Sequence, residues 1–189
     1  MRAAWLLAVV AGCALTSKAP PLEIRYFSPQ PAHPVKVESE PVNGRLRLDR
    51  VTAASHLRSQ IAHRRSPVEL ELSDTQRWAE DPEDYARRSL ERSLLARGIE
   101  LAVTGDALSL SVEVTGFEDV VHDGRHFGRV QLHYRLENDV RVIAEDTVTV
   151  ERPSAGPDIS QVVTAIGDAL SVASAQVADR LAPRVASRS

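Results

Sequence analysis

The sequence contains a single cysteine, Cys13, among 189 residues, and only 4% of its residues are aromatic. A disulfide framework is therefore excluded as the source of stability. The low aromatic content predicts a core of Leu, Val, Ile and Ala side chains. The net charge is −3 and the isoelectric point is near 6.1. This balance gives no basic surface of the kind that nucleic-acid-binding domains need, so we expect no nucleic-acid partner.

Motifs that carry catalysis are also missing. The sequence has no G-x-S-x-G nucleophile elbow and no glycine-rich phosphate loop. His122 and His126 flank the turn signal Asp123-Gly124, but a metal site there needs more ligands than the neighbouring sequence offers. We expect both histidines to be exposed turn residues. The sequence therefore predicts a protein that is not an enzyme and that uses no cofactor and no metal.

The N-terminal apolar run is short. Residues 3–11 would span about 14 Å as a helix, whereas a bilayer core requires about 20 apolar residues. Arg2 precedes the run, and it ends at Val10-Ala11-Gly12-Cys13, which resembles a bacterial lipobox. A basic start followed by a short apolar core is typical of a secretory signal. We predict a lipoprotein signal peptide over residues 1–12.

Cys13 is the predicted lipidation site, and residues 13–21 are predicted to form the acylated N-terminus and a tether. Several acyl chains would make membrane attachment effectively permanent, whereas one chain binds only marginally. The alternative is that Cys13 is an ordinary apolar residue of a signal peptide. Ala14 follows the cysteine, where Asp is associated with retention in the inner membrane. The lipobox resemblance thus implies the outer membrane, on its periplasmic face.

Residues 22–184 are predicted to form one folded domain. Alternation of apolar and polar residues is typical of strands, and the predicted strands cover residues 22–27, 45–51, 61–64, 68–72, 99–103, 108–114, 130–136 and 140–150. A bulge is expected at Gly116, and turns are expected at 105–106, 123–124 and 138–139. The proline-rich residues 28–44 are predicted to be a loop.

Two amphipathic helices complete the predicted domain. The first covers residues 82–97, with Asp81 at the N-cap, Pro82 at the first helical position and Gly98 as the stop. The second opens at Pro157-Asp158, carries apolar residues at helical spacing and is closed by Pro183. The sequence therefore predicts an α+β fold in which both helices cover one face of a largely antiparallel sheet.

Three residues between positions 55 and 80 are candidate partner-binding residues: Arg64, Arg77 and Trp78. Arg and Trp are the residue types most often found at interface hot spots. The alternative for Trp78 is a core position beneath the helix that starts at residue 82, with an arginine stacked nearby. The sequence leaves both alternatives open.

The order of these segments resembles a known family. A lipobox is followed by "RYF", "LRLDRV", "HLRSQIAHR" and "RWAE", then by a capped helix, a meander and a long C-terminal helix. This order resembles the ABC-type transport auxiliary lipoproteins of the PqiC-like group. The resemblance implies a non-enzymatic, lipid-anchored partner of an MCE-type transporter, which moves lipids or other hydrophobic compounds between membranes. It implies docking of the periplasmic MCE-domain protein at the outer membrane, and it leaves a homo-oligomer open.

Two other functions share the predicted anchor and fold. One is an assembly factor of an outer-membrane barrel, as in lipopolysaccharide export. The other is a lipoprotein hydrolase with an unrecognised site. Identification of the captured partner separates the first from MCE docking, and hydrolysis of generic esters tests the second.

Overall fold

The computed structural model describes residues 21–30, 41–103 and 107–186. The predicted signal peptide, Cys13 and all but the last residue of the predicted tether lie outside the described residues. So do the middle of the proline-rich segment and the predicted turn at 105–106.

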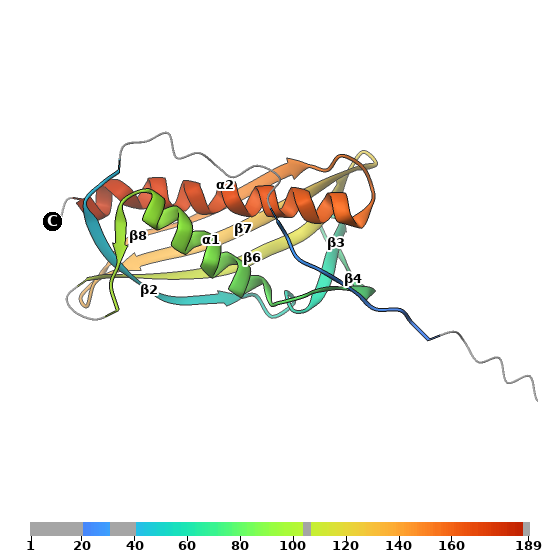
Figure 1. Cartoon of the computed structure of the whole chain (residues 1–189), viewed down its shortest axis with the longest axis horizontal. Coiled ribbons are helices and arrows are strands. Elements are labelled where there is room, and N and C mark those ends of the chain that lie inside the picture. Colours follow the sequence, from blue (N-terminus) through green and yellow to red (C-terminus); the bar gives the residue numbers. More distant parts are fainter. Residues whose placement is uncertain (1–20, 31–40, 104–106, 187–189) are drawn as a thin grey trace, which may run out of the picture.

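The described chain folds into eight strands and two helices, which confirms the predicted α+β class. Both helices lie on the same side of one sheet, and the other side carries no helix (Figure 1). The elements in chain order are β1 (Arg25–Phe27), β2 (Gly44–Ala53), β3 (Gln60–Ser66), β4 (Glu69–Trp78), α1 (Pro82–Ala96), β5 (Ile99–Leu101), β6 (Leu108–His122), β7 (Arg125–Glu137), β8 (Val142–Pro153) and α2 (Ile159–Ala186).

The predicted meander forms the antiparallel half of the sheet, in which β7 lies between β6 and β8. Asp123 (φ 50°) and Gly124 (φ 73°) make the tight turn between β6 and β7, because both central residues of such a turn need a positive φ. The ladder shifts register between Val114 and Gly116, as the predicted bulge requires.

The other edge of β6 carries two separate strands, which makes the sheet mixed rather than largely antiparallel throughout. β2 runs parallel to the first half of β6, and β3 runs parallel to residues 118–120. β5 extends the sheet beyond β2, while β4 and then β1 extend it beyond β3. We call β1, β3 and β4 the arm, because only three residue pairs, from Ala62 to Arg64, join it to β6.

Helix α2 packs very closely on β7 because Gly128 has no side chain. A Cβ atom at this position would overlap the backbone of Ala165 and Ile166. The helix buries one apolar side against the sheet, including Ile166, Leu170 and Leu181. The backbone approach at Gly128 fixes the height of α2 above the β6–β8 part of the sheet.

The helix ends depart from the sequence prediction in two details. Asp81 occupies the N-cap of α1, but its side chain accepts no capping hydrogen bond. Pro183 does not close α2, which continues to Ala186. Pro183 removes one backbone N–H donor from α2, but the residues after it continue the helix and bury Val185 against Gly44. Gly98 (φ 75°) follows α1 as predicted.

Candidate functional site

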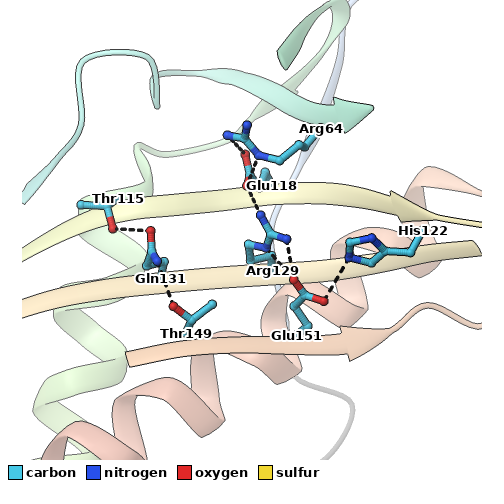
Figure 2. A network of polar contacts seen from close by, with 8 residues as sticks. All are labelled: Arg64, Thr115, Glu118, His122, Arg129, Gln131, Thr149 and Glu151. Carbon is cyan, nitrogen blue, oxygen red and sulfur yellow. Dashed lines mark hydrogen bonds and ion pairs between the residues drawn. The ribbon is translucent and has the colours of Figure 1, made fainter. Parts of the chain in front are cut away.

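The helix-free face of the sheet carries a row of charges where the arm meets β6. Arg64 on β3, Glu118 on β6, Arg129 on β7 and Glu151 on β8 alternate in sign across four strands (Figure 2). We call these four residues the charged ladder. Glu118 stands directly opposite Arg129, which stands directly opposite Glu151. Strand pairing therefore holds three of the four side chains side by side.

The ladder is closely hydrogen-bonded. Arg64 donates to both carboxylate oxygens of Glu118, from Nε at 2.8 Å and from Nη2 at 3.0 Å. Arg129 donates to Glu118 at 3.2 Å and to Glu151 at 2.7 Å. His122 lies 3.3 Å from the second oxygen of Glu151. The hydrogen bond to Glu118 is the main reason that the pKa of Arg64 is raised above its usual value, against the opposing effect of burial.

Glu118 is the buried centre of the ladder, with a side chain that is 2% exposed. The guanidinium groups of Arg64 and Arg129 both bind its carboxylate, so two positive charges lie beside one buried negative charge. A second row continues the polar pattern next to it, where Thr115 donates to Gln131 and Gln131 donates to Thr149 (Figure 2). The helix-free face is thus polar, and its central side chains are fixed by hydrogen bonds.

A hollow of about 640 Å³ lies beside the ladder. The tip of the β3–β4 hairpin forms one wall, at Arg65, Ser66 and Pro67, and the end of β6 forms another, at His122. Val120 contributes an apolar lining residue. The hollow is open on the helix-free side, so a side chain from another protein could enter it.

The opposite face of the same junction holds a second polar cluster, which we call the histidine clamp. The Nδ1 atoms of His63 and His126 each lie 2.9 Å from the buried carboxylate of Asp119. These residues come from β3, β7 and β6, so the clamp ties the arm to the meander. It borders a cavity of about 530 Å³ that is also lined by Arg25 and by the start of α2.

The environment of Asp119 favours its ionised form. Burial alone would raise its pKa and is the largest single effect, but the hydrogen bonds and charges of His63 and His126 together outweigh it. The pKa of Asp119 is therefore lower than usual. A folded-state pKa below the unfolded-state value means that the carboxylate stabilises the fold above pH 4 or so, and that this contribution is lost as the pH falls through the folded-state pKa.

Asp119→Asn should lower the free energy of unfolding by about 1–3 kcal/mol at pH 7, because the amide accepts hydrogen bonds more weakly than the carboxylate. Urea denaturation of wild type and variant from pH 7 down to pH 2.5 measures the difference. We expect it to shrink as the pH falls below about 4, where the carboxyl is first protonated in the unfolded chain, and to vanish below the lower pKa of the folded state. A difference that stays constant through this range would contradict the assignment.

The structure separates the three predicted partner-binding residues. Trp78 is 2% exposed and contacts Phe117 edge to face, with ring centroids 5.0 Å apart. Of the two alternatives for Trp78, the core position is the one the structure shows, so its ring is not offered to a partner. Arg64 is held in the charged ladder. Arg77 makes no hydrogen bond or ion pair through its side chain with another residue that the structure describes.

Arg77 lies on the helix-free face, next to an exposed tyrosine. Tyr26 of β1 pairs with Arg77 of β4, and Phe27 pairs with Trp78. Because successive side chains of a strand point to opposite faces, Tyr26 and Arg77 share the face that Phe27 and Trp78 avoid. Arg77 therefore does not stack on Trp78, and its side chain lies on the same face as the ladder, where none of the described residues pairs with its guanidinium.

Sequence reasoning missed the two acids at the centre of both clusters. Glu118 and Asp119 are adjacent charged residues within an otherwise apolar stretch that follows Phe117. Two acids in such a stretch are a signal of paired buried charges, since isolated ones are too costly. The expectation for His122 is met because it is exposed, but His126 is half-buried and bound to Asp119.

Two kinds of site are not found within the part of the chain that the structure describes. No group of three or more His, Cys, Asp and Glu side chains there is arranged to hold a metal ion. Likewise, none of the helices in residues 21–30, 41–103 and 107–186 has the length and apolar character needed to cross a membrane.

The fold and the two clusters define a class of small α+β domain, with one sheet face covered by helices and the other polar and open. The sequence model of the family described as "ABC-type transport auxiliary lipoprotein component" matches residues 27–178. The chain belongs to this family. Its family membership places it among the lipoproteins of the cell envelope that assist ABC-type transport.

Solved structures share this fold. A crystal structure of a protein from Xanthomonas campestris matches with a TM-score of 0.74 and 23% identity, over 87% of this chain and 100% of that chain. A crystal structure described as an uncharacterized protein matches with a TM-score of 0.67 and 18% identity, over 84% of this chain and 99% of that one. A hypothetical protein from Chlamydia trachomatis matches with a TM-score of 0.55 and 8% identity, over 77% and 99%. A search of curated protein sequences finds no match.

Proposed function

We propose that this chain is a non-enzymatic docking component of an MCE-type ABC transporter for lipids or other hydrophobic compounds. In this proposal Cys13 is acylated, residues 13–21 tether the chain to the periplasmic face of the outer membrane, and residues 22–184 form the domain that binds the periplasmic MCE-domain protein. Membership of the transport auxiliary family supports the general role.

One observation carries the proposal: the helix-free face of the sheet carries both the fixed charged ladder and Arg77, an arginine without a side-chain partner among the described residues. All four ladder side chains already have partners, so the surface keeps its shape without a ligand. A preorganised surface of this kind loses little side-chain entropy on binding. Arg77 adds a guanidinium that has no hydrogen-bond partner among the described residues, and arginine is favoured at interface hot spots.

The same geometry argues against a catalytic role for the two clusters. The imidazole Nδ1 atoms of His63 and His126 both face the carboxylate of Asp119. No serine, threonine or cysteine stands next to either imidazole in the hydrogen bonds of the described residues, so the arrangement lacks an activated nucleophile. The histidine clamp joins β3, β6 and β7, which is a structural role.

Arg77→Ala should weaken capture of the MCE-domain partner by tenfold or more, since truncation of an interface hot spot costs about 2 kcal/mol or more. Its free energy of unfolding should stay within about 0.5 kcal/mol of wild type, as for other surface changes. Titration of the lipidated protein in detergent against the purified MCE-domain protein gives the affinity, and urea denaturation gives the stability.

Arg141→Ala is the matched control, because Arg141 is an exposed arginine in the turn between β7 and β8, at the far end of the long strands. It should bind the partner normally. Arg64→Ala is not a clean test, since it strips Glu118 of its bidentate partner and should destabilise the fold. Normal binding by Arg77→Ala would remove Arg77 from the interface. Crosslinking to an outer-membrane barrel instead of the MCE-domain protein would favour an assembly factor.

A further inference from the structure

The described chain begins with an exposed apolar strip. Leu22 is 71% exposed, Ile24 is 44% exposed and Tyr26 is 65% exposed. These residues alternate with Glu23 and Arg25, so an extended chain presents them on one side. At Tyr26 this side is the helix-free one, because the neighbouring Phe27 packs with the core. We call Leu22, Ile24 and Tyr26 the apolar strip.

Nothing in the described fold covers the strip. β1 is an edge strand, whose partner in the described sheet is β4. Three exposed apolar side chains in a row are unlike the isolated exposed valines elsewhere, such as Val140 in the β7–β8 turn. A run of this kind marks a contact surface.

The apolar strip is separated from Cys13, the predicted lipidation site, by only a short length of chain. Leu22 is nine residues after Cys13. Nine residues reach at most about 32 Å when fully extended, since each contributes no more than about 3.6 Å. If Cys13 carries the acyl chains, the strip is the part of the domain that is closest along the chain to the lipid surface.

We infer that the apolar strip rests on the membrane that holds the lipid anchor, with Leu22, Ile24 and Tyr26 inserted among the headgroups. This inference rests on the proposed lipidation of Cys13. Tyrosine suits this depth because its ring is apolar and its hydroxyl stays in contact with water and headgroups.

The contact also orients the domain. The strip and the charged ladder lie on the same face of the sheet, with Arg77 between them in strand order, because β4 separates β1 from β3. The strip therefore brings one border of the docking face down to the membrane. A partner that binds this face would itself be held at the lipid surface.

A fluorescent probe on single introduced cysteines tests the inference. Cys13 is the only native cysteine and is blocked when acylated, so Ile24→Cys, Tyr26→Cys and Val140→Cys can each be labelled with an environment-sensitive dye. The lipidated proteins are placed in vesicles of phosphatidylethanolamine and phosphatidylglycerol, without any partner. Val140, which is 88% exposed in the β7–β8 turn, is the matched control.

We expect the dyes at positions 24 and 26 to shift their emission to shorter wavelength, to lose quenching by aqueous iodide and to be quenched by nitroxide-labelled lipid. The dye at position 140 should behave as in water. Iodide quenching that is equal at all three positions in vesicle-bound protein would overturn the inference. So would protection at 24 and 26 that appears only after the MCE-domain protein is added.

Failure of lipidation gives a different result. Mass spectrometry of the purified protein reports the acyl chains directly, and an unacylated chain that does not float with the vesicles contradicts the proposed anchor. An acylated chain that floats, with water-exposed dyes at 24 and 26, leaves the anchor intact and contradicts only the contact of the strip.

Discussion

Trp78→Ala is expected to lower the free energy of unfolding by about 3–5 kcal/mol, the range for truncation of a large aromatic side chain in a core. The ring of Trp78 meets Phe117 edge to face, and Phe117 stacks in turn with Tyr85 of α1 at a centroid distance of 6.4 Å. The tryptophan therefore connects the end of β4 to the middle of β6 and to α1. Its removal leaves a cavity at the point where these elements converge.

Tyr26→Ala is the matched control for this measurement, because it removes an aromatic ring from the strand next to β4 but from the exposed side. We expect a change within about 0.5 kcal/mol. Urea denaturation followed by far-UV circular dichroism gives both values. Similar losses in the two variants would mean that the ring of Trp78 contributes no more to the core than an exposed one.

Glu118→Ala is expected to cost about 3–5 kcal/mol, because it breaks a buried ion pair by removing one partner. The change leaves the guanidinium groups of Arg64 and Arg129 next to each other, each on a side chain that is 23% exposed, with no carboxylate between them. Glu118→Gln keeps the shape of the side chain and should cost less, since one oxygen can still accept a hydrogen bond.

Glu71→Ala provides the comparison with an exposed pair. Glu71 binds Arg65 on the arm at 3.1 Å, and the two side chains are 58% and 42% exposed. Exposed pairs contribute about 0–1 kcal/mol. Denaturation at low and high salt should show a large, weakly salt-dependent loss for Glu118→Ala and a small, screened one for Glu71→Ala. Equal losses would show that the burial of Glu118 adds nothing to the ladder.

The elements that local signals define were predictable from the sequence. The boundaries of α1 follow from Pro82 at its first position and Gly98 after its end, both of which act within one helical turn. The β6–β7 turn follows from Asp123-Gly124. Each of these signals depends on backbone preferences of neighbouring residues, so no knowledge of the rest of the fold is needed.

The pairing of the arm was not predictable in the same way. Arg64 and Glu118 are 54 positions apart, and a period-two pattern shows which residues share a face but not which strand lies alongside. β4 was also predicted too short, as residues 68–72, because its polar second half offers no alternation of apolar residues. The strand continues past an irregularity in its pairing with β3 and ends with Trp78 in the core.

The residues of the candidate site also differ in how far the sequence alone could predict them. Residue type alone made Arg77 a candidate, because arginine is enriched at interface hot spots, and its partner-binding role stays a prediction. Trp78 could not be assigned to core or surface until the pairing with Phe27 was known. The ladder and the clamp needed the three-dimensional structure, because their members come from β3, β6, β7 and β8 and meet only when the arm docks on the meander.

The attachment of the arm through β1 has a mechanical consequence. A pull on the chain at residue 21 acts along β1, which pairs in parallel with β4 over Arg25–Phe27. Such a load shears the short pairing and draws on the anchorage of Phe27 in the core, while the strand ladder carries it through β4 and β3 to β6. A protein bound at Arg77 would take up part of the tension on β4.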